Sequence, residues 1–189
     1  MKKYAVIVAG GIGRRMNSDM PKQFLPLHDK PVLYYTIQAF FDAFEDIEVI
    51  LVLPPDHVKL GRKIIDTFFQ GRQIEITIGG ETRFHSVKNG LSLILEEGII
   101  FVHDGVRCLI TPKLIHYCYN TALEYGTAIP VVASKDSIRI KTETGSQSID
   151  RNNVMIVQTP QTFLSTILLP AYNIEYKEKF TDEASVIEA

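Results

Sequence analysis

Short runs of apolar and β-branched residues recur along the chain and are separated by longer segments with helical spacing. The apolar runs are residues 4–9, 47–53, 74–78, 99–103 and 127–133. The segments with apolar residues at helical intervals are 31–44, 82–95 and 112–125. Strands that are apolar on both faces and alternate with helices are typical of a mostly parallel sheet covered on both sides. The pattern therefore predicts an α/β, Rossmann-like fold.

The pattern changes in residues 134–153. Ile138 and Ile140 alternate with polar residues, and Glu143-Thr144-Gly145-Ser146 is a turn signal. This predicts an antiparallel β-hairpin that leaves the main sheet as a projecting arm. A two-stranded hairpin is marginally stable alone, so the segment either packs on a second subunit or forms an exposed loop. The pattern by itself does not choose between the two.

The C-terminal residues carry a helix start without a helix stop. Thr181-Asp182 can cap a helix that begins near Glu183, and the sequence ends at Ala189 with no C-cap signal. We therefore expect a single domain over residues 1–189, cut short within its last helix.

Composition narrows the classes of function. The 189 residues are 46% hydrophobic and 22% charged, as in ordinary soluble domains, and the net charge of −2 gives no bulk attraction for nucleic acid. No apolar stretch reaches membrane-spanning length. Cys108 and Cys118, without a secretory signal, indicate reduced thiols in a cytoplasmic protein.

Residues 9–24, AGGIGRRMNSDMPKQF, follow the first predicted strand. The stretch lacks the third glycine of a dinucleotide fingerprint and the Gly-Lys-Ser/Thr of a P-loop. Its glycines still allow close approach to an anion, and Arg14, Arg15 and Lys22 supply cations suited to phosphate oxygens. At the carboxyl edge of a parallel sheet this predicts a phosphate site. The alternative is a glycine turn with solvated surface cations.

Residues 79–89, GGETRFHSVKN, form a second strand-to-helix loop, which we expect at the same sheet edge. Its backbone groups and hydroxyl could hold a nucleobase or ribose, through Gly80, Glu81 and Ser86. The alternative is a simple helix start with Thr82 near the cap. Arg83 is either a ligand or a surface charge.

Residues 102–107, VHDGVR, place Asp104 at the end of an apolar strand, which suits Mg²⁺. His103 is better interpreted as packed or hydrogen-bonded than as a metal ligand. Zinc is unsupported because the sequence has no second histidine at ligand spacing and no CxxC. A serine-hydrolase Gly-x-Ser-x-Gly motif is also missing.

These stretches, with DR at 150–151, QTPQ at 158–161 and TDEAS at 181–185, resemble in order the 2-C-methyl-D-erythritol 4-phosphate cytidylyltransferases. That family acts in the non-mevalonate isoprenoid pathway and belongs to the nucleotide-diphospho-sugar transferase superfamily. The resemblance covers nearly the whole chain. The glycine-rich loop belongs to the wider group of sugar nucleotidyltransferases, whereas HDGVR followed by TDEAS is narrower. Ribitol-5-phosphate cytidylyltransferase shares the first loop and is the alternative.

The resemblance implies transfer of CMP from CTP to 2-C-methyl-D-erythritol 4-phosphate, with release of pyrophosphate. Arg15 and Lys22 would stabilise charge at the α-phosphorus, and Arg151 would orient the attacking phosphate. The residues implied to surround CTP or the acceptor are Ala9, Gly10, Gly11, Gly80, Glu81, Arg83, Ser86, Asp104, Arg107, Ser137, Thr159 and Thr181. Asp104 would also bind Mg²⁺. The family's arm swaps across a homodimer, so Arg151 would act in the partner's site.

The sequence departs from the family pattern in three places. Cys108 stands where proline is usual, and Ser137 where threonine is common. The family continues beyond TDEAS with a strand, a helix and a lysine-bearing loop that this sequence lacks. Two other classes are a nucleotide-binding protein without catalysis and an NAD(P) oxidoreductase. The missing third glycine and the dense cations argue against the latter.

Overall fold

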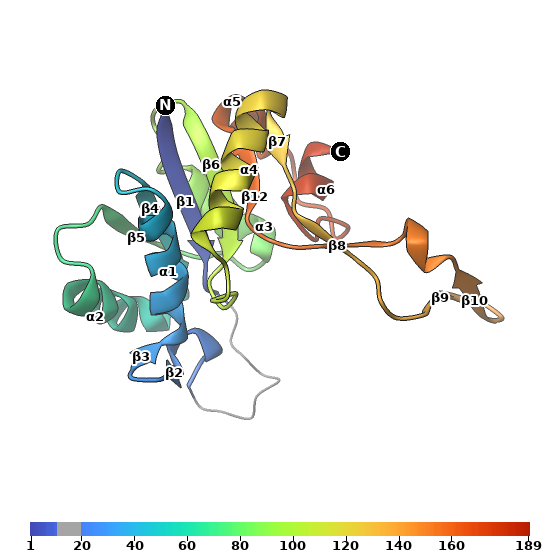
Figure 1. Ribbon diagram of the computed structural model, residues 1–189, viewed down its shortest axis with the longest axis horizontal. Coiled ribbons are helices and arrows are strands. Elements are labelled where there is room, and N and C mark those ends of the chain that lie inside the picture. The colour runs from blue at the N-terminus through green and yellow to red at the C-terminus, as the bar shows by residue number, and fades with distance from the viewer. Residues whose placement is uncertain (11–19) are drawn as a thin grey trace.

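The computed structural model describes residues 1–10 and 20–189, and the centre of this described part is a six-stranded sheet. The strand order is β5-β4-β1-β6-β12-β7 (Figure 1). The strands are β1 (Lys2–Val8), β4 (Glu48–Leu53), β5 (Ile74–Ile78), β6 (Gly98–Asp104), β7 (Thr127–Ala128) and β12 (Gln161–Leu164). Strands β5, β4, β1 and β6 are parallel, which confirms the predicted class. Strand β12 pairs antiparallel with β6 and β7, an addition that the sequence pattern did not predict.

Helices cover both faces of the sheet, as predicted. The helices α1 (Val32–Ala43), α2 (Val58–Phe68) and α4 (Pro112–Tyr125) pack on one face. The helices α3 (Arg83–Leu91), α5 (Ser165–Ala171) and α6 (Glu183–Ile187) pack on the other. Helix α2 was missing from the predicted elements. Gly61 and Ile64 of this helix are buried, and its other apolar residues pack partly buried on the same core, so the sequence does carry a helical apolar pattern here: Val58, Leu60, Ile64, Ile65 and Phe68.

Strand β6 shows why the centre of the sheet reads as a continuous apolar run. Ile99 and Phe101 belong to the cluster under α1 and α4, whereas Ile100 and Val102 belong to the cluster under α3 and α5. All four side chains have no exposed surface. A strand with helices on both faces has no polar side, because successive side chains point to opposite layers.

The predicted strand 127–133 is wrong as one element. The chain forms β7 in the main sheet and then β8 (Val131–Ala133), which pairs instead with β11 (Met155–Val157). Pro130 lies between them and has no N–H to donate to a ladder. Its carbonyl accepts a hydrogen bond from the Gln158 amide at 2.8 Å, so the ladder restarts in a different sheet.

The predicted hairpin arm is confirmed. Strands β9 (Ile138–Thr142) and β10 (Gly145–Ile149) pair antiparallel and extend away from the main sheet (Figure 1). The β8–β11 ladder forms the neck of this arm, and five of its six residues carry large exposed apolar side chains: Val131, Val132, Met155, Ile156 and Val157. The remaining short elements are β2 (Pro26–Leu27), β3 (Lys30–Pro31), η2 (Lys22–Phe24), η3 (Pro55–His57) and η4 (Arg151–Asn153).

Candidate functional site

The carboxyl ends of three parallel strands meet at one edge of the sheet. Val8 lies opposite Asp104 in the β1–β6 register. The chain that leaves β1 is held by β4, because the Ala9 amide donates to the Val52 carbonyl at 2.9 Å. The chain that leaves β6 is held by β1, because the Gly105 amide donates to the Val8 carbonyl at 2.9 Å. After β5, the Gly79 amide donates to the Leu53 carbonyl at 2.8 Å. The described starts of the predicted loops therefore lie along one edge of the sheet, where open α/β sheets bind ligands.

Two of these loops meet around Ser86, a buried residue of α3. The Gly80 amide donates to Ser86 Oγ at 3.1 Å, and Ser86 Oγ donates to the Thr82 carbonyl at 2.9 Å. A Cβ placed on Gly79 would lie 2.9 Å from Ser86 Oγ, so the backbone approaches closely only because that residue is glycine. A Cβ on Gly10, from the first loop, would lie 4.0 Å from the same oxygen. Glu81 is exposed beside them.

The Pro-Lys-Gln-Phe segment is tied to the end of β1. The amide of Gln23 is only 1% exposed, and its Nε2 donates to the Ala9 carbonyl at 2.7 Å. Lys22, half-buried, is the adjacent residue in η2. Gly11 and Arg15, also assigned to this loop, lie outside the described residues. Gln23 carried no signal in the sequence beyond its place between Lys22 and Phe24.

Helix α3 begins as the sequence predicted, with the Thr82 side chain as its N-cap. Arg83 is partly buried and ion-paired, so it is not a solvated surface charge, whereas its role as a substrate ligand stays a prediction. Its guanidinium pairs with the carboxylates of Glu183 and Asp104. Burial alone would lower the pKa of Arg83. The two carboxylates outweigh that effect, so the pKa of Arg83 is raised.

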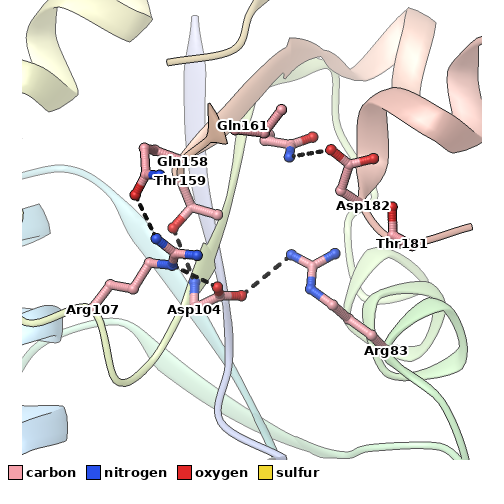
Figure 2. A pocket seen from close by; sticks show the side chains of 9 residues that line it. Arg83, Asp104, Arg107, Gln158, Thr159, Gln161, Thr181 and Asp182 are labelled. Carbon is pink, nitrogen blue, oxygen red and sulfur yellow. Dashed lines mark hydrogen bonds and ion pairs between the residues drawn. The ribbon is translucent and has the colours of Figure 1, made fainter. Parts of the chain in front are cut away.

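A pocket of about 220 Å³ opens beside this network. Figure 2 shows Arg83 and Arg107 approaching Asp104 from opposite sides, with the end of α6 across the pocket. The lining residues come from α3, β6, the chain around β11 and β12, and the cap of α6: Arg83, Asp104, Arg107, Val157, Gln158, Thr159, Gln161, Thr181 and Asp182. Five of these are residues predicted for the site. Gln158, Gln161 and Asp182 were in quoted motifs but had no predicted role in binding.

Asp104 is the centre of charge in the pocket. Its Oδ2 accepts from Arg107 Nε at 2.8 Å, and its Oδ1 accepts from Arg83 Nη2 at 3.4 Å. Arg107 Nη1 also donates to Gln158 Oε1 at 2.6 Å. Burial alone would raise the pKa of Asp104, but the two guanidinium groups outweigh it and hold that pKa below its ordinary value. The carboxylate is therefore ionised at neutral pH.

His103 lies beneath Asp104 and is completely buried. Its Nδ1 is 2.8 Å from Thr159 Oγ1, and its Nε2 is 3.3 Å from the Arg107 carbonyl. Burial lowers the pKa of His103 to about 4, so the ring is neutral. A neutral ring that donates from Nε2 and accepts at Nδ1 satisfies both partners. The interpretation of His103 as packed and hydrogen-bonded is confirmed.

The most buried charge near the site is Glu183, which sequence reasoning treated only as part of a helix start. Its side chain has no exposed surface and pairs with Arg83, while the Tyr172 hydroxyl donates to its Oε1 at 3.3 Å. Burial raises the pKa of Glu183, and Arg83 opposes that rise. The close bidentate contact with so basic a partner favours the ionised pair. Asp182 caps α6 in a capping box with Ser185, so the predicted helix start is confirmed.

Two of the predicted site residues lie on the arm, apart from both the pocket lining and the loops that meet at Ser86. Ser137 and Arg151 lie on the arm, where both are exposed. Arg151 Nη1 donates to the Lys135 carbonyl at 3.0 Å, which holds it against the arm itself. Thr159 and Thr181 do line the pocket, Thr159 buried and Thr181 exposed.

The donor set at the sheet edge restricts the metals it could hold. The described residues contain no group of three or more His, Cys, Asp or Glu side chains arranged to hold an ion. Zinc and calcium cages need such groups. Mg²⁺ is commonly held by one or two carboxylates together with substrate phosphates and waters, and Asp104 offers that single carboxylate.

A sheet of this topology, with glycine-rich loops and a charged pocket at its carboxyl edge, is typical of the α/β proteins that bind nucleotides or other phosphate ligands. Comparison with known proteins narrows this: residues 4–189 match the family model of 2-C-methyl-D-erythritol 4-phosphate cytidylyltransferase. The chain belongs to that family. Membership favours the resemblance to this family over ribitol-5-phosphate cytidylyltransferase, and it argues against an NAD(P) oxidoreductase.

Individual relatives are similar to this chain over most of their length. The chain is 44% identical to the 2-C-methyl-D-erythritol 4-phosphate cytidylyltransferases of Phocaeicola vulgatus and Bacteroides thetaiotaomicron, covering 100% of this chain and 86% of each relative. Among solved structures, 4-diphosphocytidyl-2C-methyl-D-erythritol synthase from Anaerococcus prevotii superposes with a TM-score of 0.83 at 26% identity. That superposition covers 99% of this chain and 81% of the other.

Proposed function

We propose that this chain carries out its family's reaction at the sheet edge described above. The reaction is cytidylyl transfer from CTP to 2-C-methyl-D-erythritol 4-phosphate, which gives 4-diphosphocytidyl-2-C-methyl-D-erythritol and pyrophosphate in isoprenoid precursor biosynthesis. The observation that carries the proposal is the family match over residues 4–189, because it includes every loop that builds this edge. The pocket beside Asp104 gives that match a physical location.

The nucleotide would lie over the two glycine-rich loops that meet at Ser86. Backbone groups of Ala9, Gly10 and Gly11 would face its phosphates. The cytidine would then lie against Gly80, Glu81 and Ser86. Support comes from the short distance between Gly10 and Ser86 and from the lack of side-chain bulk there. An anion among consecutive backbone amides is stabilised by their dipoles.

The chemical step needs positive charge more than it needs a base. The second pKa of a phosphate monoester is about 6, so the acceptor phosphate is already largely dianionic at neutral pH. Attack on the α-phosphorus builds charge on a pentacoordinate centre, which fixed cations stabilise. Lys22 and Arg15 would supply those cations. The Gln23–Ala9 hydrogen bond supports this role for Lys22, because it ties the adjacent backbone to the end of β1.

Asp104 would hold the divalent cation Mg²⁺, together with CTP phosphates. When bound, Mg²⁺ neutralises phosphate charge and orients the triphosphate. Asp104 suits this because its carboxylate is ionised and each oxygen retains lone pairs beside its guanidinium partner. Arg107, Thr159 and Thr181 would contact substrate from the pocket wall. Arg83, which lines the same wall and pairs with Asp104, would contact substrate beside them.

The arm supports a homodimer. The β8–β11 neck exposes apolar side chains on both of its faces, Val132 at 51% and Ile156 at 47% on one and Met155 at 67% on the other. Such a surface is unfavourable in water and is typical of an interaction site. A second copy that covers this neck would bring Ser137 and Arg151 to the pocket of its partner. Arg151 would then orient the acceptor phosphate across the interface.

The cellular location stays an expectation. Among the residues that the structure describes, no helix has the length and apolar character needed to cross a membrane. Cys108 and Cys118 are both free thiols. These thiols support a cytoplasmic setting, where disulfides are rare.

Parallel assays with two acceptors test the function. Purified protein, CTP and Mg²⁺ should release pyrophosphate with 2-C-methyl-D-erythritol 4-phosphate and much less with ribitol 5-phosphate. Preference for ribitol 5-phosphate would contradict the assignment. Binding of CTP by calorimetry without product from either acceptor would instead identify a nucleotide-binding protein without catalysis.

A further inference from the structure

Arg83 has two carboxylate partners, and they are held unequally. Both terminal nitrogens of its guanidinium contact Glu183: Nη1 lies against Oε1, and Nη2 donates to Oε2 at 3.1 Å. Only Nη2 reaches Asp104, at the longer distance of 3.4 Å. The main partner of Arg83 is therefore the buried glutamate rather than the carboxylate in the pocket.

Hydrogen bonds to the start of α6 and to its own side chain hold Glu183 in place. Gln161 Oε1 accepts from the Ala184 amide at 2.9 Å, and Gln161 Nε2 donates to Asp182 Oδ2 at 2.9 Å. These bonds fix the first turn of α6 on strand β12. The Tyr172 hydroxyl contacts Glu183 from α5. A charge without exposed surface strongly requires a charged partner, so Arg83 stays with Glu183.

The unequal contacts of Arg83 affect Asp104 because a second arginine, Arg107, also bonds this carboxylate. Arg107 Nε already bonds Oδ2 of Asp104 at 2.8 Å. If Arg83 also closed fully onto Asp104, both carboxylate oxygens would carry close guanidinium partners. A divalent cation would then meet a close guanidinium at either oxygen and would bind against stronger like-charge repulsion.

We propose that Glu183 is a positioning residue that draws Arg83 back from Asp104 and so keeps Asp104 Oδ1 accessible to a divalent cation. This rests on the cation role assigned to Asp104 under the proposed function. Arg83 thus offsets part of the negative charge of Asp104 while leaving Oδ1 free to bind a cation. The purely structural alternative is that Glu183 only anchors α6 to the sheet.

Binding of Mn²⁺, followed by electron paramagnetic resonance with CTP present and acceptor omitted, tests the proposal. In Glu183→Gln, Arg83 loses its charged partner and closes onto Asp104, so Mn²⁺ affinity should fall about tenfold, as for one added charge-assisted contact. In the double variant Arg83→Gln with Glu183→Gln, the competing guanidinium is gone. Its Mn²⁺ affinity should return to the wild-type value or exceed it.

This recovery separates positioning from structure. An anchoring defect in α6 would persist in the double variant, and persistence would overturn the proposal. So would a Glu183→Gln protein that is folded by circular dichroism and binds Mn²⁺ as wild type does. If Glu183→Gln alone fails to fold, the double variant still decides, because it buries no unpaired charge: weaker binding than wild type overturns the proposal.

Asp104→Asn distinguishes failure of this inference from failure of the cation site. If it leaves Mn²⁺ affinity unchanged, Asp104 is not the ligand, and the metal assignment falls together with the inference. If it weakens Mn²⁺ while Glu183→Gln does not, the cation site stands and only the role of Glu183 is overturned. A matched control is Tyr172→Phe, which removes one 3.3 Å hydrogen bond and leaves both charges in place. It should bind Mn²⁺ within about twofold of wild type.

Discussion

At the sheet edge, charged side chains find partners from distant parts of the same chain, whereas along the arm apolar side chains point outward. Asp104 of β6 meets Arg83 of α3, which in turn meets Glu183 of α6. On the neck, Val132 and Ile156 are paired across the β8–β11 ladder, yet both remain about half exposed. The first region can thus be understood from one chain. The second region has a surface that one chain leaves uncovered.

Matched isoleucine substitutions give the largest contrast in stability. Ile100→Ala empties a fully buried position in β6 and should cost about 2–5 kcal/mol in the free energy of unfolding. Ile156→Ala removes only a half-exposed ladder contact and should cost less than about 1 kcal/mol in dilute protein. Urea unfolding of both variants measures the difference. Equal costs would show that the neck is as tightly packed as the core.

Removal of one cation at the edge should separate activity from stability. Lys22→Ala should lower turnover about 100- to 1000-fold, the usual cost of removing a preorganised group that stabilises transition-state charge. The melting temperature should hardly change, because Lys22 is only half-buried. Steady-state pyrophosphate release measures the effect, and Lys59→Ala, an exposed lysine of α2, is the control. Unchanged turnover would remove Lys22 from the mechanism.

Mixing of two inactive variants tests whether the regions meet across a dimer. If Arg151 serves the partner's site, Lys22→Ala and Arg151→Ala subunits complement each other. Random reassociation of equal amounts should restore about one quarter of wild-type sites, because half the dimers are mixed and each has one intact site. Adding Ile156→Asp to both chains should abolish the recovery by burying a charge at the neck. No recovery in the first mixture would place Arg151 in its own subunit's site.

The smallest effect is a pH dependence at the sheet edge. Because the folded pKa of Asp104 lies below the ordinary 3.8, the ionised carboxylate stabilises the fold above that pH. This stabilisation is lost as pH falls through the lowered value. The difference in unfolding free energy between wild type and Asp104→Asn should therefore be constant near neutrality and shrink below about pH 4. A difference that grows in acid would contradict the ion-pair network.

The sequence by itself determined the parts that depend on local pattern. Apolar runs such as residues 99–103 predicted central strands because burial on both faces leaves no polar positions. Thr82 and Asp182 marked helix starts because their side chains can satisfy the first free amides. The turn at 143–146 predicted the hairpin, and the ordered motifs gave the family.

Only the tertiary structure decided which side chains share a partner. Arg83 and Glu183 are 100 residues apart, and nothing local predicts that they form a pair. Gln23 and Gln161 look like ordinary polar residues until the fold places a backbone carbonyl or a helix start beside them. Strand β12 runs antiparallel because the chain returns from the arm, a connection that no periodicity encodes. Local signals come from propensity and periodicity, whereas charge pairs across the sheet edge depend on where distant segments come to lie.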